Sequence, residues 1–235
     1  MNQDHFGTWP DLGLYVVADG MGGHNAGEVA SHLAVETIHG FIAESARTPD
    51  ITWPFALEVA LSIDLNRLTT AVRLANRRIY DEGSKHAELS GMGTTVVAAL
   101  VAGDRMMLAS VGDSRIYRYR NGSLEQLTQD DTWLNSVLGA KQAEDADASH
   151  PLRHVLTSVV GTRDDVKPGA REERLLPGDT FVLCTDGVHG RLDNAAFVSV
   201  LAGGSNPEQH ATGLVDEALT RGTSDNATAL VITIS

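Results

Sequence analysis

The middle of the chain, from Thr94 to Leu127, is a succession of short apolar segments separated by turns. Residues 94–101 and 105–111 have the apolar content of buried strands. Residues 115–120 alternate apolar and charged side chains, and the Asn121-Gly122 dipeptide that follows is a strong signal for a two-residue hairpin turn. Strands connected by such short turns pair antiparallel, so we do not expect a doubly wound parallel sheet.

Helices are predicted on both sides of this region. Apolar side chains recur at spacings of three and four over residues 26–45 and 56–83, as on one face of an amphipathic helix. The other predicted elements are helices at 194–201 and 207–220, strands at 14–18, 180–184 and 226–234, and a turn-like segment at 5–11. With strands in the middle and helices to cover them, the 235 residues are predicted to form one α+β domain.

The chain is acidic, with 31 Asp and Glu against 18 Lys and Arg and a net charge of -13. This balance argues against nucleic acid and against an anionic membrane surface as partners, because both are bound through basic patches. No run of 18 apolar residues and no cationic start followed by an apolar stretch occurs, so neither a membrane span nor a signal peptide is predicted. The single cysteine, Cys184, excludes an internal disulfide, and a cytoplasmic location is expected.

Four aspartates share one setting, where an apolar strand meets a turn: Asp19, Asp113, Asp186 and Asp225. Asp19 and Asp186 are each followed directly by glycine. Asp is common in turns, so each residue taken alone has a simpler explanation as a turn residue. Four carboxylates held at rigid strand ends are, however, what a preformed site for oxygen-coordinated metal ions requires.

A site of carboxylates without His or Cys ligands favours magnesium, manganese or calcium over zinc or copper. Two such ions that share a carboxylate can activate a bridging water for in-line attack on a phosphate ester, without a covalent enzyme intermediate.

Other phosphatase chemistries lack the residues that they need. Cys184 lies inside an apolar strand, and Arg191 follows it one residue too late for a cysteine-based phosphate loop. Neither Asp19 nor Asp186 is followed by the second Asp of an aspartyl-phosphate enzyme. No GxxxxGK[ST] loop occurs, which argues against a P-loop enzyme.

Several motifs of the chain, in this order, resemble the metal-dependent serine/threonine protein phosphatases of type 2C in their bacterial form. The matching segments are Asn2-Gln3-Asp4, VVADGMGGHNAGEVAS (16–31), GMGTTVVAAL (91–100), SVGDSRIYRYRNGSLEQLT (110–128), LTSVVGTRDDVKP (156–168), LLPGDTFVLCTDGVHG (175–190) and GTSDNATALVI (222–232). The ordered set spans essentially the whole chain. The resemblance implies one catalytic domain over residues 1–235, folded as a four-layer α/β/β/α sandwich in which helices flank two central antiparallel sheets.

The resemblance also implies the ligands of two manganese or magnesium ions. Asp19 is expected to bridge the two ions, and the carbonyl oxygen of Gly20 is expected to contribute to one of them. Asp186 and Asp225 are expected to complete the first ion. Through the water that the ions activate, Asp19, Asp186 and Asp225 are the expected catalytic residues.

The same resemblance assigns two further acidic residues and a mobile flap. Asp4 is expected to act through water or from behind the direct ligands. Asp113, with Asp186 shared, matches the residue that holds a third and weaker ion. The flap that controls substrate access is expected at about residues 130–161, including an acidic loop at 140–149.

The chain departs from the family pattern at three positions. The phosphate-binding Arg of the family would lie before Met1, so either upstream residues are missing or a different Arg serves. Met21 stands where eukaryotic members carry a His, as in bacterial relatives. Gly190 stands where some members place an acidic ligand of the third ion, and the neighbouring His189 is expected on the surface.

The function implied by the resemblance is hydrolysis of phosphoserine and phosphothreonine in proteins. The expected partners are phosphorylated proteins, including a Ser/Thr kinase and its substrates, with no nucleic acid and no membrane. The alternative is a non-catalytic domain of the same fold that binds phosphoproteins, which the absent upstream Arg favours and the intact Asp19, Asp186 and Asp225 oppose.

Overall fold

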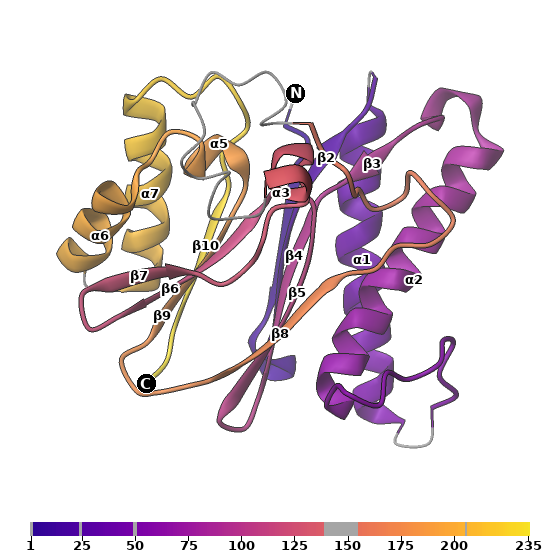
Figure 1. The fold of residues 1–235 in the computed structure, drawn as a ribbon, viewed down its shortest axis with the longest axis horizontal. Helices are drawn as coiled ribbons and strands as arrows, with labels where there is room; N and C mark the ends of the chain where they lie inside the picture. Colours follow the sequence, from indigo (N-terminus) through magenta and orange to yellow (C-terminus); the bar gives the residue numbers. More distant parts are fainter. Residues whose placement is uncertain (1, 24, 49–50, 139–154, 205) are drawn as a thin grey trace.

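The computed structural model describes residues 2–23, 25–48, 51–138, 155–204 and 206–235 (Figure 1). Its elements lie in four layers, with two antiparallel sheets packed face to face between two layers of helices. This confirms the sandwich that the family resemblance implies.

The first sheet carries the N-terminal half of the fold. Its strands follow the spatial order β1-β2-β4-β5-β8, and the short β3 pairs with the end of β2. The strands are β1 (Asp4–Trp9), β2 (Leu14–Met21), β3 (Gly93–Thr94), β4 (Val96–Ala102), β5 (Arg105–Val111) and β8 (Gly169–Arg174). All of these pairings are antiparallel, and the pairing of β4 with β5 is the one that the succession of short turns predicts.

The second sheet has the spatial order β10-β9-β6-β7. Its strands are β6 (Arg115–Arg120), β7 (Ser123–Gln126), β9 (Thr180–Cys184) and β10 (Ala229–Thr233). The predicted hairpin joins β6 to β7, and both of its central residues have positive φ, 52° at Asn121 and 79° at Gly122. Such angles are those of the hairpin turn that Asn-Gly favours.

Helices cover the outer face of each sheet. The first sheet packs against α1 (Ala26–Arg47) and α2 (Ile63–Lys85), which lie side by side in Figure 1. The second sheet packs against α5 (Asp186–His189), α6 (Asn194–Gly203) and α7 (Pro207–Thr220). The short elements are η1 (Pro10–Leu12), η2 (Ala87–Leu89) and α3 (Trp133–Leu138).

Alternating side chains of the central strands build the core on both faces of the first sheet. Along β4, Val96 and Ala98 pack towards α1 and α2, whereas Val97 and Ala99 pack between the two sheets. All four are fully buried, because a strand with a covered sheet on each side is apolar at every position. This rigid centre fixes the strand ends, where the predicted aspartates lie.

Two of the predicted elements are wrong at the N-terminal side. Residues 5–11, predicted as turn-like, contain most of β1, which pairs with β2 along its whole length. Its pattern is hard to recognise because Phe6 is 58% exposed and glycine occupies one inward position, Gly7. The second long helix begins at Ile63 rather than near residue 56, because the Ser62 side chain accepts a hydrogen bond from the Leu65 N–H and caps the helix there.

The flap predicted at about 130–161 falls partly outside the described residues. Residues 130–138 and 155–161 are described, whereas the acidic loop at 140–149 is not. None of the helices in the described part of the chain combines the length and apolar content that crossing a bilayer requires.

Candidate metal centre

The first two carboxylates of the site are brought together by strand pairing. β1 and β2 run antiparallel in a register that places Asp4 directly opposite Asp19. Their position at the end of the hairpin leaves both side chains at the edge of the sandwich rather than in its apolar centre. The Thr185 hydroxyl, from the end of β9, donates to Asp4 Oδ2 at 3.0 Å and ties this pair to the second sheet.

The backbone of Asp19 is held on both sides. Its N–H donates to the Thr95 hydroxyl at 3.1 Å, and its carbonyl oxygen accepts from the Thr95 N–H and the Thr94 hydroxyl, both at 2.8 Å. The next residue has to be glycine, because a Cβ on Gly20 would lie 2.0 Å from the carbonyl oxygen of Gly27. The Gly-rich segment therefore lets the start of α1 approach the end of β2 closely.

Two further aspartates come from the second sheet. Asp186 is the first residue of α5 and is separated from the end of β9 by Thr185, and Asp225 lies in the loop that leads to β10. The two segments touch, since a Cβ on Gly187 would lie 1.9 Å from the carbonyl oxygen of Asn226. The side chain of Asn226 also accepts from the Gln3 N–H at 2.8 Å, which joins this loop to the start of β1.

Asp113 enters from the turn between β5 and β6. It follows Gly112, whose φ of 97° favours glycine and whose N–H donates to the Asp131 side chain at 3.0 Å. His189 lies with its Nε2 2.9 Å from the carbonyl oxygen of Asp113. His189 was expected on the surface; it is instead half-buried and lines the cleft beside the aspartates.

These aspartates act on one another electrostatically. Burial raises the pKa of Asp19 to about 9, with further contributions from Asp4, Asp186, Asp113 and Asp225. Burial likewise raises the pKa of Asp113 to about 7, assisted by the charge of Asp186. The pKa of Asp4 is also raised, chiefly by burial. Raised pKa values in a group of carboxylates indicate that too little positive charge lies nearby. A bound divalent cation would provide that charge.

The donor set fits hard divalent cations, although no three Asp, Glu, His or Cys side chains in the described ranges form a complete metal site as they stand. Within the same ranges, Asp4 Oδ1 is buried without a hydrogen-bond partner. Such an oxygen is costly unless it meets an ion, a water or a donor. Strand pairing places Asp4 opposite Asp19, the hydrogen bond from Gln3 to Asn226 joins the Asp225 loop to the start of β1, and Asp113, Asp186 and Asp225 line one cleft.

A cleft of about 1030 Å³ opens beside the aspartates, with Asp113, Asp186 and Asp225 in its lining. Among the residues that the structure describes, the lining also includes Arg115 and Arg191, neither of which was predicted to belong to the site. Arg115 forms a two-pronged ion pair with Asp130, at 3.0 and 2.7 Å. Arg191 is exposed, and its position just after α5 is the only sequence signal that could have pointed to it.

Cys184, the nucleophile that a cysteine-based phosphatase would need, is fully buried in β9. Burial raises the pKa of its thiol to about 12, so the thiolate is disfavoured. This confirms its predicted place in the core.

Three comparisons with known proteins bear on this site. A model of the family described as Protein phosphatase 2C matches residues 1–221. The serine/threonine phosphatase stp of Listeria welshimeri serovar 6b is 30% identical over 235 residues, covering 98% of this chain and 89% of its own.

Two solved structures share the fold. The serine/threonine phosphatase of S. agalactiae superposes with a TM-score of 0.84 at 32% identity, over 100% of this chain and 94% of its own. The catalytic domain of the serine/threonine protein phosphatase PstP, solved in complex with two manganese ions, superposes with a TM-score of 0.79 at 30% identity, over 98% of this chain and 90% of its own.

Proposed function

The chain belongs to the protein phosphatase 2C family and is a metal-dependent serine/threonine protein phosphatase, and from this premise we propose which residues perform the reaction. The relatives reported above are phosphatases by name, so they support catalysis rather than the alternative of a non-catalytic phosphoprotein-binding domain. We propose that residues 1–235 form a single catalytic domain.

Asp19, the carbonyl oxygen of Gly20, Asp186 and Asp225 hold two divalent cations in this proposal, with Asp4 behind them. The observation that carries it is the convergence of these aspartates from separate strand ends, with Asp4 opposite Asp19 and with Asp186 and Asp225 lining one cleft. The raised pKa of Asp19, caused by burial and by the other aspartates, agrees with it. The two manganese ions of the related PstP domain support the number and kind of ion. Magnesium is the alternative ion, and Asp113 with Asp186 is the proposed seat of a third, weaker one.

In this proposal the residues of the chain hold the cations and position the substrate. None of them forms a covalent bond to the substrate. Cations held by Asp19, Asp186 and Asp225 would supply an activated water and would compensate the charge that develops on the phosphoryl oxygens. Thr94 and Thr95 hold the backbone of Asp19 on both sides, so the position from which its side chain extends is fixed. Asp4 is fixed by Thr185 and contributes negative charge from behind Asp19.

Arg191 is our candidate for the arginine that receives the substrate phosphate in this chain. Arg115, which also lines the described part of the cleft, is paired with Asp130. An exposed guanidinium beside Asp186 and Asp225 can form paired hydrogen bonds with a phosphate. Replacement by Gln in Arg191→Gln should raise KM for a phosphopeptide more than it lowers kcat.

We propose phosphorylated proteins as the substrates, among them a Ser/Thr kinase and the targets of that kinase. A cytoplasmic site of action fits the single reduced cysteine and the acidic composition. The net charge of -13 repels acidic phosphoproteins, so bound cations also serve to make the cleft accessible to them.

The deciding experiment is hydrolysis of a phosphothreonine peptide and of para-nitrophenyl phosphate, with manganese and with chelator. We expect manganese-dependent turnover that Asp186→Ala abolishes. The matched control is Asp165→Ala, which removes an Asp that is 69% exposed, is paired with Arg73 and is not among the described residues that line the cleft. Turnover that persists in Asp186→Ala, or without added or bound metal, would overturn the proposed centre.

A further inference from the structure

One face of β1 is turned away from the aspartates and packs on α1. Because side chains of a strand alternate, His5 and Trp9 lie on the face opposite Asp4. Trp9 stacks on His39 of α1 with the ring centroids 4.1 Å apart and the planes at 2°. Further along the same contact between β1 and α1, the ring of His5 packs against that of His32.

The two imidazoles face each other through ring nitrogens. His5 Nε2 and His32 Nδ1 are 3.3 Å apart, and the rings stand at 75° with centroids separated by 4.7 Å. Two nitrogens that bind one tetrahedral zinc ion, each about 2.1 Å from it, lie about 3.4 Å apart. The spacing of the pair is therefore already that of two ligands of one ion.

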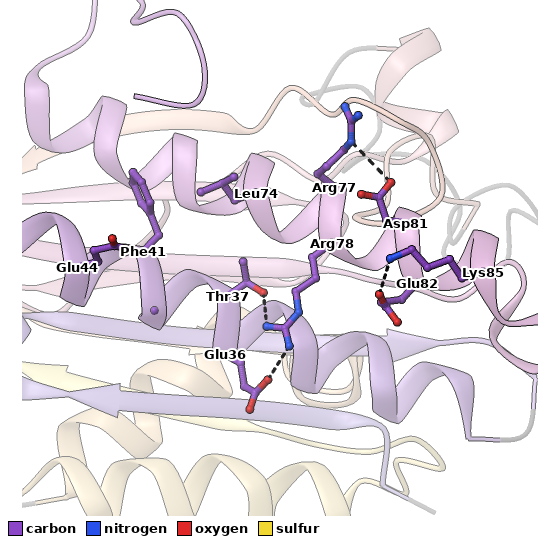
Figure 2. A pocket seen from close by; sticks show the side chains of 11 residues that line it. Glu36, Thr37, Phe41, Glu44, Leu74, Arg77, Arg78, Asp81, Glu82 and Lys85 are labelled. Atoms are coloured by element: carbon purple, nitrogen blue, oxygen red, sulfur yellow. Dashed lines mark hydrogen bonds and ion pairs between the residues drawn. The ribbon is translucent and has the colours of Figure 1, made fainter. Parts of the chain in front are cut away.

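The second nitrogen of His32 is held by a carboxylate. His32 Nε2 lies 3.4 Å from Glu36, one turn further along α1. Glu36 is held in turn by Arg78 of α2, at 3.3 Å, and Figure 2 shows Arg78 reaching both Glu36 and Thr37. A carboxylate on the outer nitrogen is the arrangement that orients metal-binding histidines and makes the inner nitrogen a better ligand.

A third ligand is available on the same helix. Glu28 lies one turn before His32 on α1, is exposed, and acts electrostatically on His5. Its carboxylate does not complete a three-ligand group in the described structure. Rotation of this exposed side chain, together with water, would complete four-coordination around an ion at the two imidazoles.

We propose that His5 and His32 form a binding site for one zinc ion, with Glu36 as the orienting partner and Glu28 as a further ligand. The site differs in chemistry from the carboxylate centre, because imidazole selects zinc whereas manganese and magnesium prefer oxygen. A bound ion ties β1 to α1 and thereby fixes the strand that carries Asp4. Zinc would then act on the phosphatase without occupying its catalytic ligands.

The simpler explanation is a plain hydrogen bond between two neutral imidazoles at the surface. Isothermal titration of the full chain with zinc, in saturating magnesium, separates the two explanations. We expect one equivalent of zinc that disappears, or binds at least about tenfold more weakly, in His5→Gln and His32→Gln. Glu36→Gln should weaken the same equivalent about tenfold.

His86→Gln is the matched control. His86 is half-exposed and lies 3.5 Å from Glu82 and 3.9 Å from Glu88, so it has acidic neighbours without a second imidazole. His86→Gln should retain the equivalent in full. His32→Gln replaces an exposed side chain, so we expect this variant to fold. Its zinc titration therefore decides the question even if His5→Gln misfolds.

A second measurement locates the ion. Crystals soaked in zinc should show an anomalous peak between His5 Nε2 and His32 Nδ1. Equal zinc stoichiometry and affinity in the wild type and His32→Gln, or no peak between the two rings, would overturn the proposal.

Discussion

Two acid-rich regions of this molecule place their carboxylates in opposite electrostatic surroundings. At the edge of the sandwich, Asp4, Asp19 and Asp113 have raised pKa values because burial and neighbouring carboxylates disfavour their charged forms. Across β6, β7 and β8, the acids are instead interleaved with arginines.

This second region, the paired strip, is defined by Arg118, Arg120, Glu125, Arg171, Glu173 and Asp179. Burial raises the pKa of Asp179, but hydrogen bonds and charge from Arg120 outweigh it, and the pKa ends below its usual value. The two ion-pair contacts between Arg120 and Asp179 are both 2.5 Å.

The difference teaches that acidity alone does not mark a functional site in this fold. A buried carboxylate that has an arginine partner contributes to the native structure. A group of carboxylates that face mainly each other opposes folding, and the proposed cations would offset that cost. Each region should therefore respond to mutation in the opposite way.

The largest expected effect is on catalysis, at Asp19. Asp19→Asn should lower kcat/KM for a phosphopeptide on the order of 10³-fold, which is about 4 kcal/mol of transition-state stabilisation. The metal-free variant should unfold at the same or a higher denaturant concentration than the metal-free wild type, because a repulsion is removed. If Asp19→Asn lost stability as well as activity, the expected difference between the two regions would be wrong.

In the paired strip we expect the reverse outcome. Arg120→Met leaves the carboxylate of Asp179, which is 1% exposed, without its ion-pair partner. It should lower the free energy of unfolding by about 2 to 3 kcal/mol, measured by urea denaturation, while kcat of the folded enzyme stays unchanged. A Tm equal to that of the wild type would show that the pair does not stabilise the fold.

The third prediction concerns pH and the metal-free protein. The pKa of Asp19 is about 9 in the folded state, against 3.8 for an unperturbed Asp, so the folded state binds the extra proton between these values. Its stability contribution is fully present below pH 4 and is lost as the pH rises towards 9, by up to about 1.4 kcal/mol per pH unit.

Denaturation in chelator between about pH 5.5 and 8.5 measures this slope. The free energy of unfolding should fall with rising pH in the wild type and fall less in Asp19→Asn. Saturating manganese should reduce the slope of the wild type, because the ion replaces the proton. An unchanged slope in Asp19→Asn would assign the pH dependence to other groups.

The smallest expected effect is that of replacing an exposed glutamate of the paired strip, compared with a buried one. The Glu125 side chain is 44% exposed and that of Glu173 is 11% exposed, although both pair with Arg118 and Arg171. Glu125→Gln should cost less than about 1 kcal/mol, because water screens an exposed pair. Glu173→Gln should cost more in the same urea titration, and equal costs would show that burial does not decide the worth of these pairs.

Sequence alone predicted those parts of the fold whose cause is local. The apolar content of residues 94–101 and 105–111, the alternation over residues 115–120 and the Asn121-Gly122 turn give β4 to β7 directly. β1 was missed, because one of its faces meets solvent at Phe6 and the other carries His5, Gly7 and Trp9 against α1. The strand is defined by its pairing with β2, which no local pattern encodes.

The same limit applies to the charged side chains. The strand-end positions of Asp19, Asp113 and Asp186 were visible as a pattern of apolar run, Asp and turn. The partnership of Arg120 with Asp179 joins residues 59 positions apart, and that of His5 with His32 joins a strand to a helix. Such contacts depend on packing of the layers, so they are seen only in three dimensions.

The hydrogen bond between Gln3 and Asn226 has a consequence for synthesis of the enzyme. This hydrogen bond spans 223 positions of the chain, and Asp225 is the neighbour of its acceptor. A nascent chain that has left the ribosome only as far as β9 contains Asp4 and Asp19, but lacks the Asp225 loop and β10. With the role proposed here for Asp225, we expect the domain to gain activity only after the Asp225 loop and β10 have been synthesised and have packed against the start of β1.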